Sequence, residues 1–288
     1  MPGTAPSYTL TLACRGGTGQ IAQASSLLAA HGCYIDEMSV FDDSSNGRFF
    51  LRCVFHAEQA PVDAPALRRA LADADDGRFD MHWQLYEAGP RPRVLIMVSR
   101  LDHCLNDLIY RQRIGDIDMD IAAVVSNHTL LEPVARAAGL PFLHLPLSAE
   151  TRAAQEDRLL ELMAASGSEL LILARYMQVL SHETSLALAG RAINIHHSFL
   201  PGFKGARPYH QAHARGVKLI GATAHYVTDD LDEGPIIEQV VERVDHAFTP
   251  ERLQAAGRDM ECQALARAVR YHLERRTFIN GSRVVVLR

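Results

Sequence analysis

The stretch Asn194-Ile195-His196-His197-Ser198 ends one apolar run of this chain, and Leu231-Asp232-Glu233-Gly234-Pro235 follows a second. A loop rich in Gly, Pro and basic residues, Pro201–Pro208, lies between them. An amide, an imidazole and a carboxylate at neighbouring strand ends suit acyl or formyl transfer. His196 and Asp232 are too far apart in the sequence for one helix or strand, so only a fold that pairs these strands brings them together.

Strands and helices alternate on both sides of the first stretch. This alternation predicts an α/β fold with a mostly parallel sheet flanked by helices. The predicted strands are Val94–Ser99, Ile121–Ser126, Phe142–Leu147, Leu170–Ala174, Asn194–Ser198, Gly221–Val227, Pro235–Val244 and the terminal Arg283–Leu287. The predicted helices are Asp102–Arg113, Leu130–Ala138, Glu150–Ala165 and Pro250–Arg275.

The N-terminal residues predict a separate small domain with the order βαββαβ. Asn46-Gly47 between two strands is a hairpin signal, because both residues tolerate positive φ. The Gly/Pro segment Glu87–Arg93 is a linker. We therefore expect domains at residues 1–88 and 93–288. The predicted elements of the first domain are strands Tyr8–Ala13, Tyr34–Phe41, Arg48–Phe55 and Phe79–Tyr86, with helices Ile21–Ala30 and Pro65–Asp73.

The composition narrows the class of partner. A formal charge of −5 and a pI near 6.3 argue against a broad nucleic-acid surface. The five cysteines include no C-x-x-C pair, which favours a reducing compartment over a disulfide framework. The N-terminus lacks a basic and an apolar signal region, and the apolar runs are shorter than a membrane span. We expect a cytoplasmic protein without membrane or nucleic-acid partners.

The constellation of Asn194, His196 and Asp232 resembles the folate-dependent formyl transferase family. The segment from Ile193 to Gln239 is most similar to its hydrolytic branch, the formyltetrahydrofolate deformylases. The resemblance implies a ferredoxin-like ACT domain, regulatory or dimerising, followed by a Rossmann-like formyl transferase domain. Four further segments carry it: Ser99–Leu105, Val124–His128, Leu173–Met177 and Asn194–Leu200.

The resemblance also implies the site residues. Asn194, His196 and Asp232 fall on the family's catalytic triplet, and His225 is a supporting residue. The pterin pocket is expected to use an apolar wall and a second loop, and Arg175 or a nearby basic residue is expected to meet the glutamate tail of folate. The expected substrate-binding residues are Arg175, Met177, Gln178, Val179, Leu180, Val227 and Asp230.

The residue types match hydrolysis of an N-formyl group. Negative charge develops on the formyl oxygen, where Asn194 and His196 can donate hydrogen bonds. Asp232 can orient water and accept its proton. His196, His197, His225 and Asp232 could bind zinc by type, but no H-x-x-x-H or H-E-x-x-H spacing is present. We expect neither a metal nor a cofactor, because the folate is the substrate.

Two other branches of the family fit less well. Ser99–Leu105 lacks the glycines of a phosphate-binding loop, which argues against a nucleotide acceptor. Negative charge and the position of the chain end argue against a tRNA acceptor. We predict hydrolysis of 10-formyltetrahydrofolate to tetrahydrofolate and formate, in support of one-carbon balance and purine synthesis. The alternatives are formyl transfer to an amine acceptor, or a non-catalytic amino-acid or folate sensor.

The N-terminal domain implies further partners. In ACT domains a small ligand binds where the first strand turns into the first helix, here Cys14–Gly19. Relatives commonly carry an acidic residue in this turn, and Gly16-Gly17 stands here instead. The turn therefore serves either an amino-acid effector or a purely structural purpose. Such modules often pair, so we expect a homo-dimer or homo-tetramer.

Overall fold

The computed structural model describes residues 7–58, 61–74, 77, 79–87, 89–148, 150–200 and 208–288. The chain divides into two compact units. The first comprises residues 1–90 together with Arg275–Phe278 and Val285–Arg288, and the second comprises Arg91–Glu274 and Ile279–Val284. Two short C-terminal segments thus group with the N-terminal unit, which the division of the chain at residues 88 and 93 did not anticipate.

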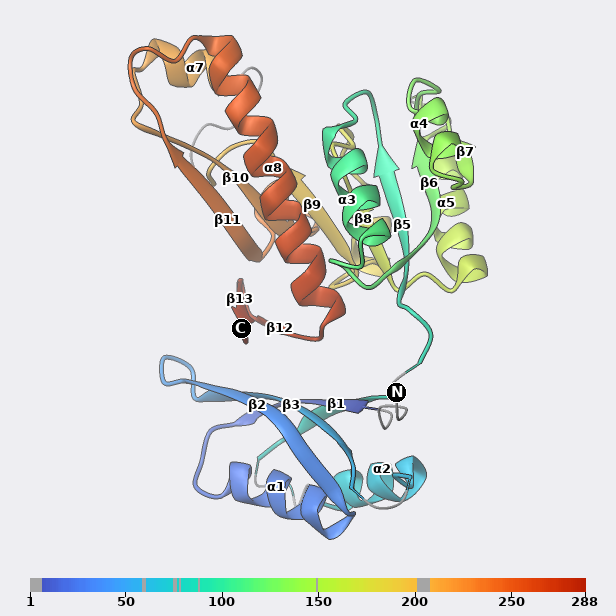
Figure 1. Cartoon of the computed structure of the whole chain (residues 1–288), viewed down its shortest axis with the longest axis vertical. Coiled ribbons are helices and arrows are strands. Elements are labelled where there is room, and N and C mark those ends of the chain that lie inside the picture. Colours follow the sequence, from blue (N-terminus) through green and yellow to red (C-terminus); the bar gives the residue numbers. More distant parts are fainter. Residues whose placement is uncertain are drawn as a thin grey trace. The chain divides into compact units, whose positions relative to one another are not determined.

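The N-terminal unit has the predicted order βαββαβ (Figure 1). Its four-stranded sheet is antiparallel, with the order β2-β3-β1-β4. Both helices lie on one face of that sheet, where they bury a core that includes Leu10, Leu28, Leu51 and Leu67. The elements are β1 Ser7–Arg15, α1 Gln20–Ala30, β2 Cys33–Asp43, β3 Arg48–Ala57, α2 Ala64–Asp73 and β4 His82–Glu87.

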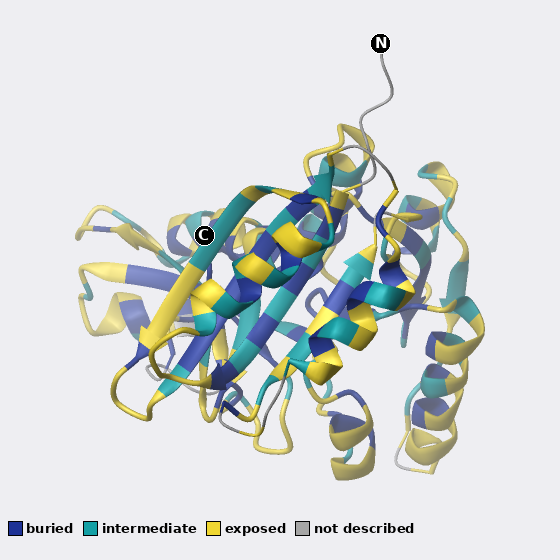
Figure 2. Ribbon diagram, turned by 90° about the horizontal axis from the view of Figure 1, so that it is seen from below, coloured by how far each residue is buried: buried dark blue, intermediate teal, exposed yellow. Residues whose placement is uncertain are grey.

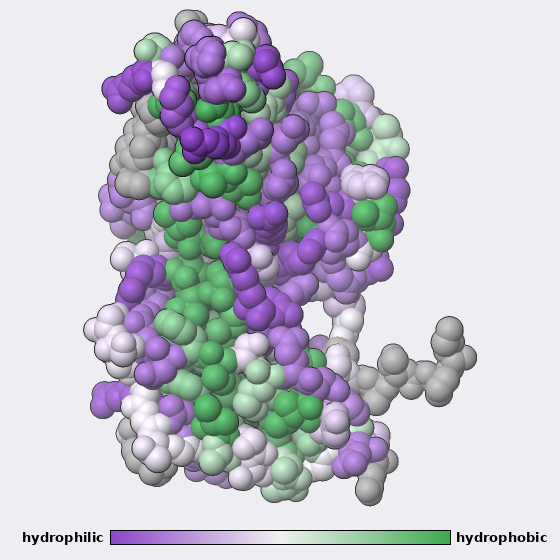
Figure 3. All heavy atoms as spheres, turned by 60° about the vertical axis from the view of Figure 1, so that its left-hand side comes forward, coloured by the Kyte–Doolittle hydropathy of each residue, from purple (hydrophilic) through white to green (hydrophobic). Residues whose placement is uncertain are grey.

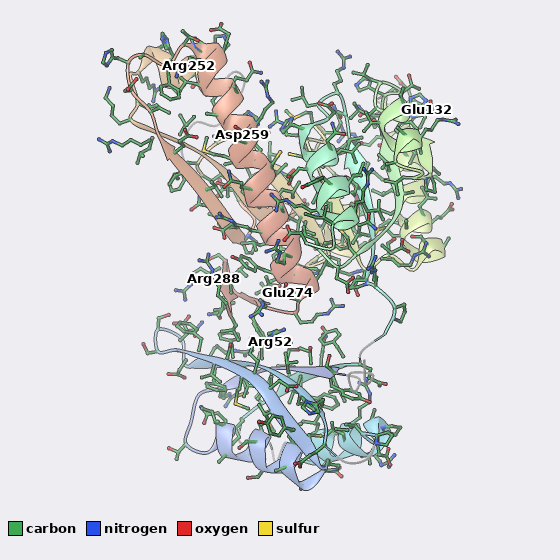
Figure 4. All side chains as sticks on the ribbon, viewed as in Figure 1. Arg52, Glu132, Arg252, Asp259, Glu274 and Arg288 are labelled. Atoms are coloured by element: carbon green, nitrogen blue, oxygen red, sulfur yellow. The ribbon has the colours of Figure 1, made fainter. Side chains whose placement is uncertain are left out.

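C-terminal residues complete this unit. The ring of Phe278 lies 5.5 Å from that of buried Phe50, between centroids. Glu37 accepts hydrogen bonds from Arg52 at 2.8 Å and from Arg276 at 3.1 Å (Figure 4 labels Arg52). The predicted terminal strand is β13, Arg283–Val286, and it pairs with β12, Thr277–Asn280, which the sequence pattern did not reveal.

The second unit is built on a seven-stranded sheet with the order β11-β10-β9-β8-β5-β6-β7. The strands from β5 to β9 pair in parallel, and β10 and β11 are antiparallel additions at one edge. The α/β fold with a mostly parallel sheet is therefore confirmed. The strands are β5 Arg93–Val98, β6 Asp120–Ser126, β7 Phe142–His144, β8 Leu170–Leu173, β9 Ala192–His196, β10 Leu219–Tyr226 and β11 Ile236–Arg243.

Helices flank this sheet and leave the central strands buried. All four residues of β8 are buried, as expected for a parallel strand covered on both faces. Buried residues follow the strands and the inner sides of the helices, while exposed residues lie outward (Figure 2). The helices are α3 His103–Arg113, α4 Glu132–Ala137, α5 Arg152–Ser166, α6 His182–Ala187, α7 Pro208–Ala214 and α8 Pro250–Leu273.

The long helix α8 begins where its sequence predicts. Thr249 caps it by accepting from the backbone N–H of Arg252, and Pro250 fits the first turn. The short helices α6 and α7 were not predicted, because six or seven residues hold too few turns for a periodic pattern. Within the described ranges, no helix combines the length and apolar character that crossing a membrane requires. The basic loop at residues 201–207 lies outside the described residues.

Candidate functional site

The register of β9 against β10 brings the first polar side chains together. Asn194 is the cross-strand partner of His225, and His196 is the partner of Thr223. Alternate residues of a strand point to one face, so Asn194 and His196 share a face. The Asn194 Nδ2 lies 3.3 Å from the His225 Nε2. Because the His225 Nδ1 lies 2.8 Å from the carbonyl oxygen of Tyr226, that nitrogen carries hydrogen, and Nε2 faces both the Asn194 amide and Asp232.

Asp232 reaches the two imidazoles from the turn between β10 and β11. Its Oδ1 lies 3.1 Å from the His196 Nδ1 and 3.7 Å from the His225 Nε2. The residue has a φ of 59°, which is uncommon for residues other than glycine. A Cβ at Gly234 would lie 1.8 Å from the carbonyl oxygen of Tyr226, so this close return of the chain requires glycine.

The environment keeps Asp232 ionised. Burial alone would raise its pKa, but the hydrogen bonds and charges of His196 and His225 outweigh burial and hold the pKa well below its usual range. Both imidazole distances given above are to Oδ1. An ionised carboxylate accepts hydrogen bonds only. Oδ2 can therefore accept a hydrogen from a water molecule in the pocket.

A buried hydroxyl network holds the other side of the His196 ring. The His196 Nε2 lies 2.8 Å from the Ser198 Oγ. The Thr223 hydroxyl donates to the Ser198 carbonyl at 3.0 Å, and the Gln239 amide donates to the Thr223 oxygen at 3.0 Å. Sequence reasoning missed Ser198, Thr223 and Gln239 as supporting residues. Only Thr223 could have been found from the sequence, because it lies two residues before His225 and therefore points to the same face of the strand.

Asn194, His196, His225 and Asp232 line one pocket with a volume of about 250 Å³. Every site residue predicted from the sequence lines it. They are Arg175, Met177, Gln178, Val179, Leu180, Asn194, His196, His225, Val227, Asp230 and Asp232. The remaining lining residues are Leu173, Tyr176, Ile195, His197, Thr228 and Leu231.

The pocket has an apolar wall after β8. Met177 is 55% exposed and Val179 is 44% exposed, although both are apolar, while Leu180 is buried. Exposed apolar side chains that line a concave site are available to a flat, partly apolar ligand. Across the pocket, Val227 and the exposed carboxylate of Asp230 form part of the second loop.

Arg175 is buried, whereas a residue that meets the glutamate tail of folate would be expected to be exposed. Its side chain is only 9% exposed, and its Nε lies 3.4 Å from the Oε2 of buried Glu261 on α8. Glu261 was not selected from the sequence, because it lies within a long amphipathic helix where acidic residues are common. The structure therefore adds Glu261 to the polar groups behind the pocket.

One group of metal-ligand types occurs among the described residues. Its members are His103, Cys104 and Glu261, whose ligand atoms lie within 4.8 Å of one another. The neighbouring guanidinium of Arg175 opposes a cation there. The hydrogen bond with Cys262 and burial raise the pKa of the Cys104 thiol well above its usual value, so the thiolate that binds metals is disfavoured. This donor set does not fit a divalent metal.

Comparisons with known proteins agree on one family. A family model described as formyl transferase matches residues 92–269. A formyltetrahydrofolate deformylase of Corynebacterium sp. (strain P-1) is 50% identical over 98% of each chain. The crystal structure of a formyltetrahydrofolate deformylase from Burkholderia mallei ATCC 23344 has a TM-score of 0.93 and 59% identity, covering 98% of this chain and 99% of its own. Glycinamide ribonucleotide transformylase 1 from Symbiobacterium toebii has a TM-score of 0.66 and 34% identity, and covers 71% of this chain and 98% of its own.

Proposed function

This chain belongs to the formyl transferase family and, within it, to the formyltetrahydrofolate deformylases, and from that premise we propose that it hydrolyses 10-formyltetrahydrofolate to tetrahydrofolate and formate. The convergence of Asn194, His196 and Asp232 in one pocket is the observation that carries the proposal. We further propose that the activity balances one-carbon pools and supplies formate for purine synthesis in the cytoplasm.

Asn194 is the first donor to the formyl oxygen in this proposal. Its amide has two N–H groups, and at most one of them can point to the His225 Nε2. The second can donate to the oxygen that gains negative charge when water adds to the formyl carbon. A preorganised donor of this kind stabilises the transition state by about 3 to 4 kcal/mol.

His196 is the second donor in this proposal. The ionised Asp232 lies 3.1 Å from its Nδ1 and holds the ring in place. Its Nε2 lies 2.8 Å from the Ser198 Oγ, and in this proposal the formyl oxygen takes the place of that hydroxyl as the partner of Nε2. The Ser198–Thr223 hydrogen bond keeps the ring from turning away.

Asp232 orients the attacking water through its Oδ2 and accepts the water proton. Water oxygen bonds to the formyl carbon, the bond from that carbon to the folate nitrogen breaks, and the nitrogen gains a proton. The products are tetrahydrofolate and formate, and one water is consumed. No cofactor enters this balance.

The pterin is placed against the apolar wall of Met177, Val179 and Leu180 in this proposal, with Gln178 beside it and Val227 and Asp230 opposite. Burial of apolar area contributes about 25 cal/mol per Å² to binding. The exposure of Met177 and Val179 at the pocket supports this placement.

The test is formate release from 10-formyltetrahydrofolate by the purified chain without an amine. We expect formate and tetrahydrofolate to form in equal amounts at a catalytic rate. Turnover that appears only after an amine is added would replace hydrolysis by formyl transfer. Folate binding without either product would identify a sensor. Both outcomes contradict the proposal.

We also propose that the N-terminal unit pairs with a second copy of this chain. Its strand β2 is an edge of the sheet, and Val40 and Phe41 on that strand are exposed. Hydrophobic residues gather on one face of this unit (Figure 3). An amino-acid effector at the turn Cys14–Gly19 is proposed on the family resemblance alone. Light scattering with and without added amino acids tests both proposals.

A further inference from the structure

Arg175 is a buried cation in the pocket wall with unused hydrogen-bond donors. It follows the end of β8 and has a φ of 66°, a conformation that costs free energy in residues other than glycine. Its side chain is 9% exposed. Among the described residues, neither its Nε nor its buried Nη1 has a hydrogen-bond acceptor. An unsatisfied buried donor destabilises the folded protein, so this arrangement calls for an acceptor.

The carboxylate beside Arg175 does not serve as that acceptor. Glu261 is 2% exposed, and its Oε2 lies 2.7 Å from the His103 Nε2. Its Oε1 accepts from the Tyr209 hydroxyl at 3.1 Å. The Arg175 Nε is 3.4 Å from Oε2 and makes no hydrogen bond to it. Glu261 thus balances the charge of the guanidinium while its own oxygens are committed to other donors.

Arg175 is the one Arg or Lys among the described residues that line the pocket. Burial, the charge of Arg175 and that of His196 lower the pKa of His197 to about 4, so His197 is neutral near pH 7. Asp232 places a negative charge beside His196. An anion formed beside Asp232 is repelled by that carboxylate and attracted by the Arg175 guanidinium.

We propose that Arg175 binds the carboxylate of the product formate, and that Glu261 sets the strength of this binding. The inference rests on the proposed hydrolysis, which converts a neutral formyl group into a one-carbon carboxylate inside this pocket. Guanidinium–carboxylate hydrogen bonds are charge-assisted and are stronger than neutral ones. A small carboxylate satisfies the donors that the protein leaves unused.

The experiment titrates sodium formate into the full chain in the presence of tetrahydrofolate, followed by calorimetry, with sodium chloride as the salt control. Arg175→Gln should raise the formate Kd at least about tenfold, which is a loss of about 1.4 kcal/mol. Glu261→Gln should lower the Kd, because the cation loses its balancing charge. The two changes in Kd therefore have opposite signs.

Arg270 provides the matched control. It lies on α8 with Glu261, pairs with Asp116 at 2.5 Å, and also has a buried Nε without an acceptor, but it does not line the pocket. Arg270→Gln should leave the formate Kd within about twofold of the original, a change of about 0.4 kcal/mol. If Arg175→Gln does not fold, the double variant Arg175→Gln/Glu261→Gln removes both charges and should show the same loss of formate binding.

The proposal is overturned if Arg175→Gln or the double variant binds formate as the original chain does. It is also overturned if Glu261→Gln weakens formate binding as much as Arg175→Gln, because that result assigns the pair a purely structural role. Formate release from 10-formyltetrahydrofolate is measured separately. If formate is released but its binding does not depend on Arg175, this inference alone is refuted. If no formate is released, the proposed hydrolysis is refuted.

Discussion

Replacing Asp232 by Asn removes the charge on which the proposed water activation depends, with almost no change in side-chain volume. The carboxylate is 14% exposed and lies 3.1 Å from the His196 Nδ1. Loss of a general base reduces turnover by about 10² to 10⁴. A factor of 10² corresponds to about 2.7 kcal/mol in the activation free energy. The same carboxylate also holds His196, and effects of groups that act together do not add. We therefore expect kcat to fall at least about 100-fold.

The KM for 10-formyltetrahydrofolate should change less than about threefold, because the proposed pterin contacts lie on other residues. Formate release measures both constants. Asp229→Asn is the matched control. Asp229 is exposed, pairs with His182 at 2.8 Å and does not line the pocket. It should keep full activity. An Asp232→Asn variant that retains more than about a tenth of the original kcat would refute the assigned role.

Three further variants test the account. His196→Ala should lower kcat about 100-fold with a smaller change in KM, measured by formate release. Gly234→Ala places a carbon 1.8 Å from the Tyr226 carbonyl oxygen and should lower Tm by several degrees, whereas Gly89→Ala, whose nearest contact is 3.7 Å, should not. Burial first, then neighbouring positive charge, lowers the pKa of His197 from 6.5 to about 4. The native state then binds fewer protons than the unfolded chain, so stability falls as pH drops through this window. His197→Asn should weaken that dependence in urea titrations at pH 7 and pH 5, and an unchanged dependence would contradict the sign.

The sequence predicted the strands, and the residues that line the pocket, better than the pairing of the strands. Short-range patterns identify apolar strands and the polar residues that follow them. The antiparallel register that places His225 opposite Asn194 is a long-range property, and alternating strands and helices suggest parallel pairing by default. The positive φ of Asp232 could not be predicted from the sequence either, because its side chain reaches His196 only after the chain turns back at Gly234.

The buried pair of Arg175 and Glu261 behind the pocket could not be predicted from the sequence. Arg175 or a nearby basic residue was expected to meet the glutamate tail, because that tail is anionic and usually exposed. Its neighbour Glu261 interacts with His103 across 158 residues of sequence, and each lies in a helix with other charged residues. A pattern within one helix does not distinguish a buried carboxylate from a solvated one. Only the packing of α3 against α8 brings His103 and Glu261 together.

Hydrolysis of 10-formyltetrahydrofolate in water enriched in oxygen-18 tests the central claim most directly. Mass spectrometry of the formate measures whether solvent oxygen entered it. The account predicts one labelled oxygen per formate, release matched by tetrahydrofolate, and loss of both products in Asp232→Asn. A formylated amine in place of labelled formate would contradict it, because water would then not be the acceptor.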